Sequence, residues 1–347
     1  MKKIAVCLPS YNECENIEQL TIKIDSALCL INDKYDCIII NCDNNSPDGT
    51  NYIFNSTRTI NRKVSIVTNK IGKGVNIYNF LKYCIENDVD YAITIDSDTK
   101  NFTSSWLIDI LNELENNADF VYPNYIRRKE EGNTTNHFAV LMLYTVYGKF
   151  IRQPIGGDYG FSRRYIEIVL KQKFTKNILK YGIDIFLVVT AIVFNLKMKE
   201  VFLGRKKHKP SYSRLDTIFE NVVNGFTDTY KQYPVNLKKE KIMYKPRVIK
   251  NCRWHYRKYF DKIYKEILKK YGYSDRDYEI IEKIWLTKLS YYSKNILNIK
   301  EDFIDELKDY FILRVVSFWD RISLDNNMKW EEIIIKNCIE LGGKNGN

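Results

Sequence analysis

Short apolar runs and amphipathic stretches alternate over the first 100 residues. The runs KIAVCLP, YDCIIINCD, KVSIVTN and DYAITIDSD are short, apolar at their centres and rich in β-branched residues, which is typical of buried strands. Three helices are predicted between these strands. ECENIEQLTIKIDSAL places its apolar residues on one helical stripe, and TNYIFNSTR is a helix that Asp48 or Thr50 can cap. The third helix is GVNIYNFLKYCIEN. Strands that alternate with helices of this length predict a mostly parallel α/β sheet covered by helices on both faces.

The pattern changes twice along the rest of the chain. Residues 101–205 mix helices with two more strands, DFVYPNY and KEVFLGRKKH, and contain a glycine-rich loop, QPIGGDYGF, that leads into a helix. After residue 215 only long amphipathic patterns remain, and the predicted helices cover 215–233, 250–272, 275–299, 301–322 and 328–341. We therefore predict an α/β domain over 1–214 and an α-helical C-terminal subdomain over 215–347.

Composition supports a folded protein of about two domains. The 347 residues are 45% hydrophobic and 28% charged, which excludes a mainly disordered chain. The eight cysteines form no C-x-x-C pair and no zinc-site cluster with histidines, and most lie in apolar runs. We expect reduced cysteines and a cytoplasmic protein.

We expect no secretory leader and no membrane span. The N-terminal apolar run has five residues, which suits a strand, and is too short for the core of a signal peptide. The longest apolar stretch, IDIFLVVTAIVFN, has fewer than 18 residues and includes Asp184. It is therefore predicted to be a buried helix.

Polar residues gather just after the four predicted strands of the first 100 residues. They are Pro9, Ser10, Tyr11, Asn12 and Glu13 after the first, Asp43 to Asp48 after the second, Gly72, Lys73 and Gly74 after the third, and Asp96, Ser97 and Asp98 after the fourth. Ligands of open α/β sheets bind outside the carboxyl ends of the strands. The convergence of four polar loops on one rim is the strongest indication of a site.

Two of these loops suggest a phosphate ligand and a cation. If the segment Asp96-Ser97-Asp98 is extended, its two carboxylates face one spot and suit a hard divalent cation. A solvated turn is equally compatible with this D-x-D sequence. The Gly-Lys-Gly loop can approach a phosphate or simply start a helix. Neither a Walker A motif nor a G-x-G-x-x-G after the first strand is present, which argues against a P-loop or dinucleotide enzyme.

The four motifs LPSYNECENI, CDNNSPDGT, IGKG and IDSD, in this order and spacing, resemble those of GT-A nucleotide-sugar glycosyltransferases. The resemblance implies a Rossmann-like GT-A fold in which the D-x-D holds Mg²⁺ or Mn²⁺ on the donor diphosphate. Many inverting relatives carry two Asp before a Gly in the second loop. Here the run is Asp43-Asn44-Asn45, so one carboxylate is missing.

Segments after residue 120 indicate a particular group within the GT-A glycosyltransferases. YIRRKEEGNTTN, IRQPIGGDYGFSRR, YGIDIFLVVTAI and LGRKKHKPS are similar to segments of the mannosylglycerate and glucosylglycerate synthase group. That group consists of retaining GT-A transferases with a helical C-terminal region. The likeness implies transfer of a hexose from a nucleoside-diphosphate sugar to a small, carboxylate-bearing, glycerate-like hydroxy acid.

The resemblance also implies roles for particular residues. The donor would contact Pro9, Tyr11, Glu13, Asp43, Lys73, Asp96 and Ser97; the cation would bind Asp98 and His208; the acceptor would contact Arg127, Thr135, Gly156 and Gly157; and Asp158 and Asp184 would line the reacting sugar, with Lys73 beside the leaving group.

Each role has a simpler alternative. His208 lies among cations and could be a solvated surface residue, and Arg127 could belong to a solvated charge run. Asp158 could cap the helix that follows it. Asp184 is harder to explain without function, because a carboxylate in an apolar helix needs a partner.

Under the GT-A interpretation, the divalent cation and nearby lysines stabilise the departing diphosphate, and Asp184 orients the sugar or stabilises an oxocarbenium-like centre.

An alternative function is that of an inverting transferase acting on a polyprenyl phosphate or a glycan. A third is a nucleotide-sugar or nucleic-acid-binding module without turnover, but no RNA-binding aromatic signature or arginine-rich tail is present. The long C-terminal helices could also form a homo-oligomer.

The net charge of +11 is unevenly distributed. Residues 1–198 carry a net charge of +1, residues 199–214 carry +5 and residues 215–347 carry +5. The excess of positive charge at 199–214 adjoins the expected cation site and suits a diphosphate ligand better than a nucleic acid. The excess after residue 215 could serve a membrane or another anionic partner.

Overall fold

The protein consists of two compact units. In the computed structural model, the described residues are 1–209, 212–247, 260–324 and 329–344. The first unit comprises Met1–Tyr125 and Ile155–Lys209, and the second comprises Ile126–Pro154 and Pro210–Asn347. This division differs from the predicted one at residue 214, because the helical segment 126–154 is grouped with the C-terminal helices and not with the sheet.

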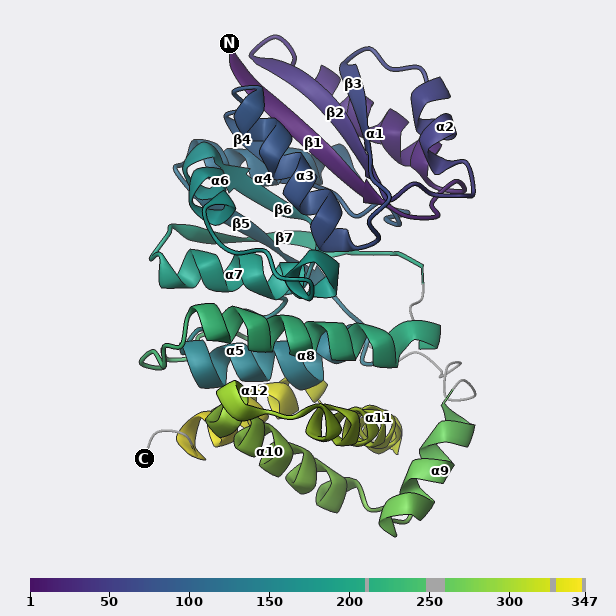
Figure 1. Ribbon diagram of the computed structural model, residues 1–347, viewed down its shortest axis with the longest axis vertical. Coiled ribbons are helices and arrows are strands. Elements are labelled where there is room, and N and C mark those ends of the chain that lie inside the picture. The colour runs from purple at the N-terminus through teal and green to yellow at the C-terminus, as the bar shows by residue number, and fades with distance from the viewer. Residues whose placement is uncertain (210–211, 248–259, 325–328, 345–347) are drawn as a thin grey trace. The chain divides into compact units, whose positions relative to one another are not determined.

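The first unit is built on a seven-stranded sheet (Figure 1). Its strands are β1 (Lys2–Ser10), β2 (Tyr35–Asp43), β3 (Arg62–Val67), β4 (Tyr91–Thr94), β5 (Phe120–Ile126), β6 (Tyr159–Ser162) and β7 (Met198–Arg205). They lie in the order β3-β2-β1-β4-β6-β5-β7. The first four run parallel, and β6 runs antiparallel to both of its neighbours, β4 and β5. The predicted mostly parallel sheet is confirmed.

Helices cover the sheet on both faces. They are α1 (Ile17–Cys29), α2 (Thr50–Ser56), α3 (Lys73–Glu86), α4 (Ser104–Glu115), α6 (Arg163–Leu170), a π-helix at Ile178–Gly182 and α7 (Ile183–Val193). α1 contacts α2 and α4, and α3 contacts α6 and α7. Along β1, Ile4, Val6 and Leu8 join the core formed with α1 and α4. The intervening residues point to the other face, where α3 packs on β1 and β2.

β6 was not predicted. The sequence pattern indicated a loop that leads into a helix, but residues 159–162 pair with β4 and β5 before α6 begins. A strand of four residues that contains a glycine gives little periodic signal. Gly160 is needed here because a Cβ at this position would collide with the Ile110 side chain on α4.

The second unit is helical. It contains a π-helix at Thr135–Ala139, α5 (Val140–Tyr147), α8 (Leu215–Gln232), α9 (Asp261–Tyr271), α10 (Tyr278–Asn295), α11 (Glu301–Leu324) and α12 (Trp330–Lys344), with short 3₁₀ turns at Tyr212–Arg214 and Ile296–Asn298. In its core, the rings of Phe219 and Phe311 stack at a centroid distance of 3.9 Å. The predicted helical C-terminal region is confirmed, although residues 250–259 and 328 of its predicted helices lie outside the described residues.

Within the described parts of the chain, none of the helices is both long enough and apolar enough to span a membrane.

Candidate active site

The loops at the carboxyl ends of the parallel strands are tied together in the first unit. Ser97, after β4, donates a hydrogen bond from Oγ to the Pro9 carbonyl of β1 at 2.7 Å. Asn16 donates from Nδ2 to the Ser97 carbonyl at 2.6 Å. Asn76 on α3 donates to the Ser10 carbonyl at 3.2 Å. Loops that are far apart in sequence thus form one edge of the sheet.

At this edge, five charged residues form a continuous series of ion pairs, which we call the charge chain: Asp184, Lys73, Asp96, Lys206 and Asp158. Asp158, Asp184 and Lys206 are buried, and Lys73 and Asp96 are partly buried. The Lys73 ammonium lies 3.2 Å from an Asp184 oxygen and 3.1 Å from Asp96 Oδ1. The Lys206 ammonium lies 2.7 Å from Asp96 Oδ2 and 2.8 Å from Asp158 Oδ2. Three carboxylates and two ammonium groups therefore alternate.

Different elements deliver these side chains. Lys73 begins α3, Asp184 lies in the first turn of α7, and Lys206 follows β7. α3 can approach the segment before α7 closely because Gly74 has no side chain, and a Cβ there would collide with the Ile178 carbonyl. The partner that a buried Asp184 requires is Lys73, on an element more than 100 residues away in sequence.

The pKa shifts follow the position of each group in the chain. Burial alone would raise the Asp96 pKa, but the ammonium groups of Lys206 and Lys73 outweigh burial and hold it well below its usual range. Burial raises the pKa of Asp184 and that of Asp158, because each has only one lysine partner. Burial disfavours charged Lys73 and Lys206, yet the adjacent carboxylates raise both pKa values. Both lysines are therefore cationic at neutral pH, and the negative charge is most firmly held on Asp96.

Asp158 is part of this network and does not cap a helix. Its Oδ1 accepts from the Asp96 backbone N–H at 2.7 Å, and its Oδ2 accepts from the Tyr125 hydroxyl. The N-cap of α6 is Ser162, whose hydroxyl accepts from the Tyr165 N–H. The capping alternative for Asp158 is therefore wrong, because β6 separates Asp158 from the helix.

The glycine-rich loop lies against the charge chain. Gly157 has a φ of +90°, and a Cβ there would collide with the Asp96 carboxylate. Its carbonyl accepts from Thr94 Oγ1 at 3.0 Å, and the Gly156 carbonyl accepts from Lys206 at 3.2 Å. The two glycines let the backbone pass close to Asp96 and help to hold Lys206.

Asp96 and Asp98 do not act as two parallel carboxylates of an extended segment. Ser97 and Asp98 form a turn, closed by a hydrogen bond from the Thr99 N–H to the Asp96 carbonyl at 3.0 Å. Asp96 engages the two lysines, whereas Asp98 lies 3.8 Å from His208 Nδ1. The segment is therefore a turn and not extended, and the two carboxylates have different partners.

The basic loop after β7 is fastened to the loop after β4. Asn101 donates to the Arg205 carbonyl at 2.6 Å, and the Lys100 N–H donates to the Lys207 carbonyl at 2.8 Å. Lys209 forms an ion pair of 2.9 Å with Glu13. These contacts place His208 beside Asp98.

The pair Asp98–His208 could hold one divalent cation with help from a ligand. Both side chains are about 29% exposed, and their nearest N and O atoms are 3.8 Å apart. Two ligands of one octahedral ion at roughly 2.1 Å are about 3 to 4 Å apart, so the spacing fits once Nδ1 gives up its 2.8 Å contact with the Lys209 carbonyl. Among the described residues, no group of three or more His, Cys, Asp or Glu side chains is arranged to hold a metal. Oxygen atoms of a bound ligand and water would have to supply the remaining coordination positions.

The remaining predicted donor residues surround the end of β1. Tyr11 is 37% exposed. Asp43 is fully buried, its Oδ1 accepts from the Ser46 N–H at 2.6 Å, and its Oδ2 has no partner among the described residues. Burial raises the Asp43 pKa against the opposing hydrogen bonds from Ser46. A buried acceptor of this kind suits an N–H or O–H of a ligand.

The two predicted acceptor residues outside the glycine loop belong to the other unit. Arg127 donates from Nε to Gln153 at 3.4 Å, and Thr135 is buried where the π-helix 135–139 begins. Both lie in the unit formed by 126–154 and the C-terminal helices, whereas the charge chain lies in the first unit.

Sequence reasoning missed three contributors to the charge chain. Lys206 was included only as one cation of the basic loop, and nothing in RKKHK distinguishes it from Lys207. Tyr125 hydrogen-bonds Asp158, and Tyr159 hydrogen-bonds Asp184. Both tyrosines were assigned only to strands or loops, because their partners are distant in sequence.

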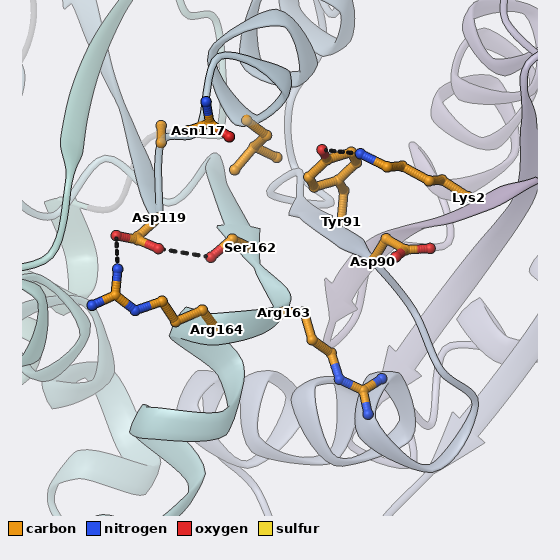
Figure 2. A pocket seen from close by; sticks show the side chains of 10 residues that line it. Lys2, Asp90, Tyr91, Asn117, Asp119, Ser162, Arg163 and Arg164 are labelled. Carbon is orange, nitrogen blue, oxygen red and sulfur yellow. Dashed lines mark hydrogen bonds and ion pairs between the residues drawn. The ribbon is translucent and has the colours of Figure 1, made fainter.

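A pocket of about 360 Å³ lies at the opposite end of the sheet (Figure 2). It is lined by Lys2 at the start of β1, and β1 spans nine residues before it reaches the candidate site, roughly 25 Å away. Some of its polar groups pair with one another: Lys2 donates to the Tyr91 hydroxyl at 2.8 Å, and Asp119 pairs with Arg164 at 3.4 Å. This pocket is separate from the charge chain.

Comparison with known proteins agrees with this architecture. Residues 5–170 match the model of the glycosyl transferase family 2 domain. An uncharacterized glycosyltransferase of Synechocystis sp. is 26% identical over 176 residues, which are 49% of this chain and 53% of the relative. The match thus spans about half the length of that relative.

Solved structures share the fold. Glucosyl-3-phosphoglycerate synthase from Mycobacterium tuberculosis, in complex with phosphoglyceric acid, has 22% sequence identity and a TM-score of 0.54, over 67% of this chain and 81% of that chain. The same enzyme with Mn²⁺, uridine diphosphate and phosphoglyceric acid gives the same identity and TM-score over 66% and 78%. These likenesses confirm the GT-A fold. Residues 5–170 therefore match a glycosyl transferase family 2 domain, in agreement with the resemblance of the motifs.

Proposed function

We propose that this protein transfers a hexose from a nucleoside-diphosphate sugar to a small hydroxy acid that carries a carboxylate. The observation that carries the proposal is the charge chain at the carboxyl edge of the sheet, in which Lys73 and Lys206 are held by three carboxylates. Lys73 is the cation of this charge chain that a departing diphosphate can most readily engage, because it is shared between Asp96 and Asp184 and its side chain is about 16% exposed.

The donor would lie along the ends of β1 and β2. The buried acceptor atom Asp43 Oδ2 suits the base or ribose, and Pro9, Tyr11, Glu13 and Ser97 frame the same edge. The solved neighbours were crystallised with uridine-diphosphate-glucose or uridine diphosphate, which supports a donor of this class.

We propose that Asp98 and His208 hold a divalent cation, Mg²⁺ or Mn²⁺, as a pair completed by donor oxygens. Such a cation would neutralise charge that develops on the diphosphate. Neighbouring structures contain Mn²⁺ or Mg²⁺ together with the nucleotide.

Lys73 and Asp184 would contribute at the sugar. Lys73 bridges Asp96 and Asp184, so an entering phosphate oxygen can share its ammonium group without a large movement. Asp184, with its pKa raised by burial, is well placed to orient a sugar hydroxyl. In the front-face route to retention that we favour, the departing diphosphate itself accepts the acceptor proton, and Asp158 keeps Lys206 in place.

For the acceptor, we propose a glycerate-like acid. Arg127 and Thr135 would bind its carboxylate, and Gly156 and Gly157 would line the sugar. The mycobacterial neighbour was crystallised with phosphoglyceric acid, which supports this class of acceptor.

The proposal is tested by measuring nucleoside diphosphate release. The screen combines uridine- and guanosine-diphosphate hexoses with glycerate, 3-phosphoglycerate and a polyprenyl phosphate, each with Mn²⁺, with Mg²⁺ and with EDTA. We expect release that requires both a cation and a hydroxy acid. Turnover only with the polyprenyl phosphate, or equal turnover in EDTA, would contradict the proposal. NMR of the product anomer then distinguishes retention from inversion.

A further inference from the structure

A buried asparagine in the loop after β2 holds the loop that delivers Lys73. Asn44 follows Asp43 directly and is 4% exposed. Its Nδ2 donates to the Lys70 carbonyl at 2.7 Å, and its Oδ1 accepts from the Gly72 N–H at 3.3 Å. One side-chain amide thus binds the backbone at two points just before Lys73 begins α3.

A second asparagine completes this contact from the first turn of α3. Asn76 is 2% exposed, and its Nδ2 donates to the Ser10 carbonyl of β1 at 3.2 Å and to Asn44 Oδ1 at 3.1 Å. In return, Asn44 Nδ2 donates to Asn76 Oδ1 at 2.7 Å. These two side chains, which we call the amide pair, therefore connect the ends of β1 and β2 to the start of α3.

Backbone groups determine the orientation of both amides. The carbonyls of Lys70 and Ser10 can only accept, so each faces an Nδ2, and the Gly72 N–H can only donate, so it faces an Oδ1. Both hydrogens of each Nδ2 are then used within the protein. A carboxylate at residue 44 would place an oxygen against the Lys70 carbonyl and against Asn76 Oδ1, where donors are needed.

The Gly-Lys-Gly loop also lies against the segment before α7. A Cβ at Gly72 would be only 2.2 Å from the Leu179 carbonyl oxygen. Asp184, which lies 3.2 Å from the Lys73 ammonium, is in the first turn of the helix that follows this segment. The loop is therefore held by the amide pair and by the backbone that leads to Asp184.

We infer that Asn44 is a positioning residue for Lys73. Its amide holds the backbone of residues 70–72, so that the Lys73 ammonium stays between two carboxylates of the charge chain, where a donor phosphate would meet it. Asn44 acts through this backbone and has no hydrogen to spare for the donor. The effect on turnover rests on the proposed function, whereas the effect on the position of Lys73 does not.

A double-variant cycle in turnover tests the inference. Asn44→Asp keeps the size of the side chain but removes both N–H donors. We measure kcat and KM for nucleoside diphosphate release in the wild type, Asn44→Asp, Lys73→Gln and the double variant. Asn44→Asp should lower kcat by about 10- to 100-fold with little change in KM for the donor, because a catalytic group displaced by about 1 Å costs up to this factor. In the Lys73→Gln background, the same substitution should have almost no effect.

Two further variants separate positioning from a general loss of stability. Asn44→Ala removes the amide without adding a charge, and its effect should depend on Lys73 in the same way. Asn61→Asp is the matched control, because Asn61 donates to Asp25 Oδ1 at 2.8 Å just before β3, so this variant also puts a carboxylate where a donor is needed. Its effect on kcat should be small and equal in both backgrounds. Equal losses of kcat from Asn44→Asp in both backgrounds would overturn the inference.

A second cycle needs no turnover and so separates this inference from the proposed function. Urea unfolding is measured for the same four proteins. We expect the effect of Lys73→Gln on the unfolding equilibrium constant to be about 5-fold smaller, or less, in the Asn44→Asp background, since residues of one network are coupled to this extent. An unchanged effect would overturn the inference. If Lys73→Gln releases nucleoside diphosphate at the wild-type rate, the proposed function fails, and the unfolding cycle alone decides whether Asn44 positions Lys73.

Discussion

Lys206 shows how strongly one side chain depends on its surroundings in this site. Its ammonium group is 2% exposed and lies between Asp96 and Asp158, both within 2.8 Å. We expect Lys206→Met to lower the free energy of unfolding by about 3 to 5 kcal/mol, because it leaves the buried Asp158 without its cation and the partly buried Asp96 with one fewer. Urea unfolding measures this loss.

The neighbouring lysine provides the control for this experiment. Lys207 is exposed, so Lys207→Met should change stability by less than about 0.5 kcal/mol. The double variant Lys206→Met with Asp158→Asn removes one charge of each sign and should recover part of the stability. Equal losses from Lys206→Met and Lys207→Met would show that the charge chain does not contribute.

Gly157 tests the close approach of the glycine loop to Asp96. Gly157 and Gly204 both have positive φ, +90° and +69°, but only at Gly157 would a Cβ collide with another residue. Gly157→Ala should therefore lower donor affinity and stability, whereas Gly204→Ala should show only the backbone strain of about 1 to 2 kcal/mol. Donor titration by calorimetry separates the two, and a wild-type dissociation constant for Gly157→Ala would refute the role of the close approach.

At the scale of elements, the start of α6 shows that helix capping and the charge chain use different residues, which the sequence alone could not distinguish. Ser162 caps the helix, and Asp158 belongs to the charge chain. Ser162→Ala should cost about 1 kcal/mol of stability and leave turnover near wild type, whereas Asp158→Asn should lower turnover strongly. Thr103→Ala is the control, because the Thr103 side chain makes no capping bond. A loss of turnover in Ser162→Ala equal to that in Asp158→Asn would contradict this division.

The elements with strong periodicity were predicted well. The C-terminal helices and the strands β1 to β3 have six residues or more, and the shorter β4 is marked by an unbroken apolar run. The pattern failed at β6, which has four residues, and at the turn 97–98, where a hydrogen bond to the Asp96 carbonyl overrides the extended conformation. Within the site, the sequence marked Asp96, Lys73 and Asp184 but could not pair them, because pairing depends on how α3 and α7 approach each other.

For the whole molecule, the structure changes the meaning of the excess charge. The basic loop 205–209 was expected to offer its cations to a diphosphate. Lys206 is instead neutralised by Asp96 and Asp158, and Lys209 by Glu13. Charge counting along the sequence cannot see these partners, because they lie more than 45 residues away. Lys73, shared between Asp96 and Asp184, is the cation that can most readily turn to a donor phosphate.

The central claim is that the charge chain is the donor site of a glycosyltransferase, and Lys73→Gln tests it most directly. The measurement is the rate of nucleoside diphosphate release from the best donor found in the screen, with Mn²⁺ and a hydroxy acid acceptor, for the wild type and the variant at matched folded concentration. We expect the variant to be slower by about 100-fold or more, since a preorganised donor at the developing charge is worth this factor in comparable sites. Release at the wild-type rate by folded Lys73→Gln would contradict the account.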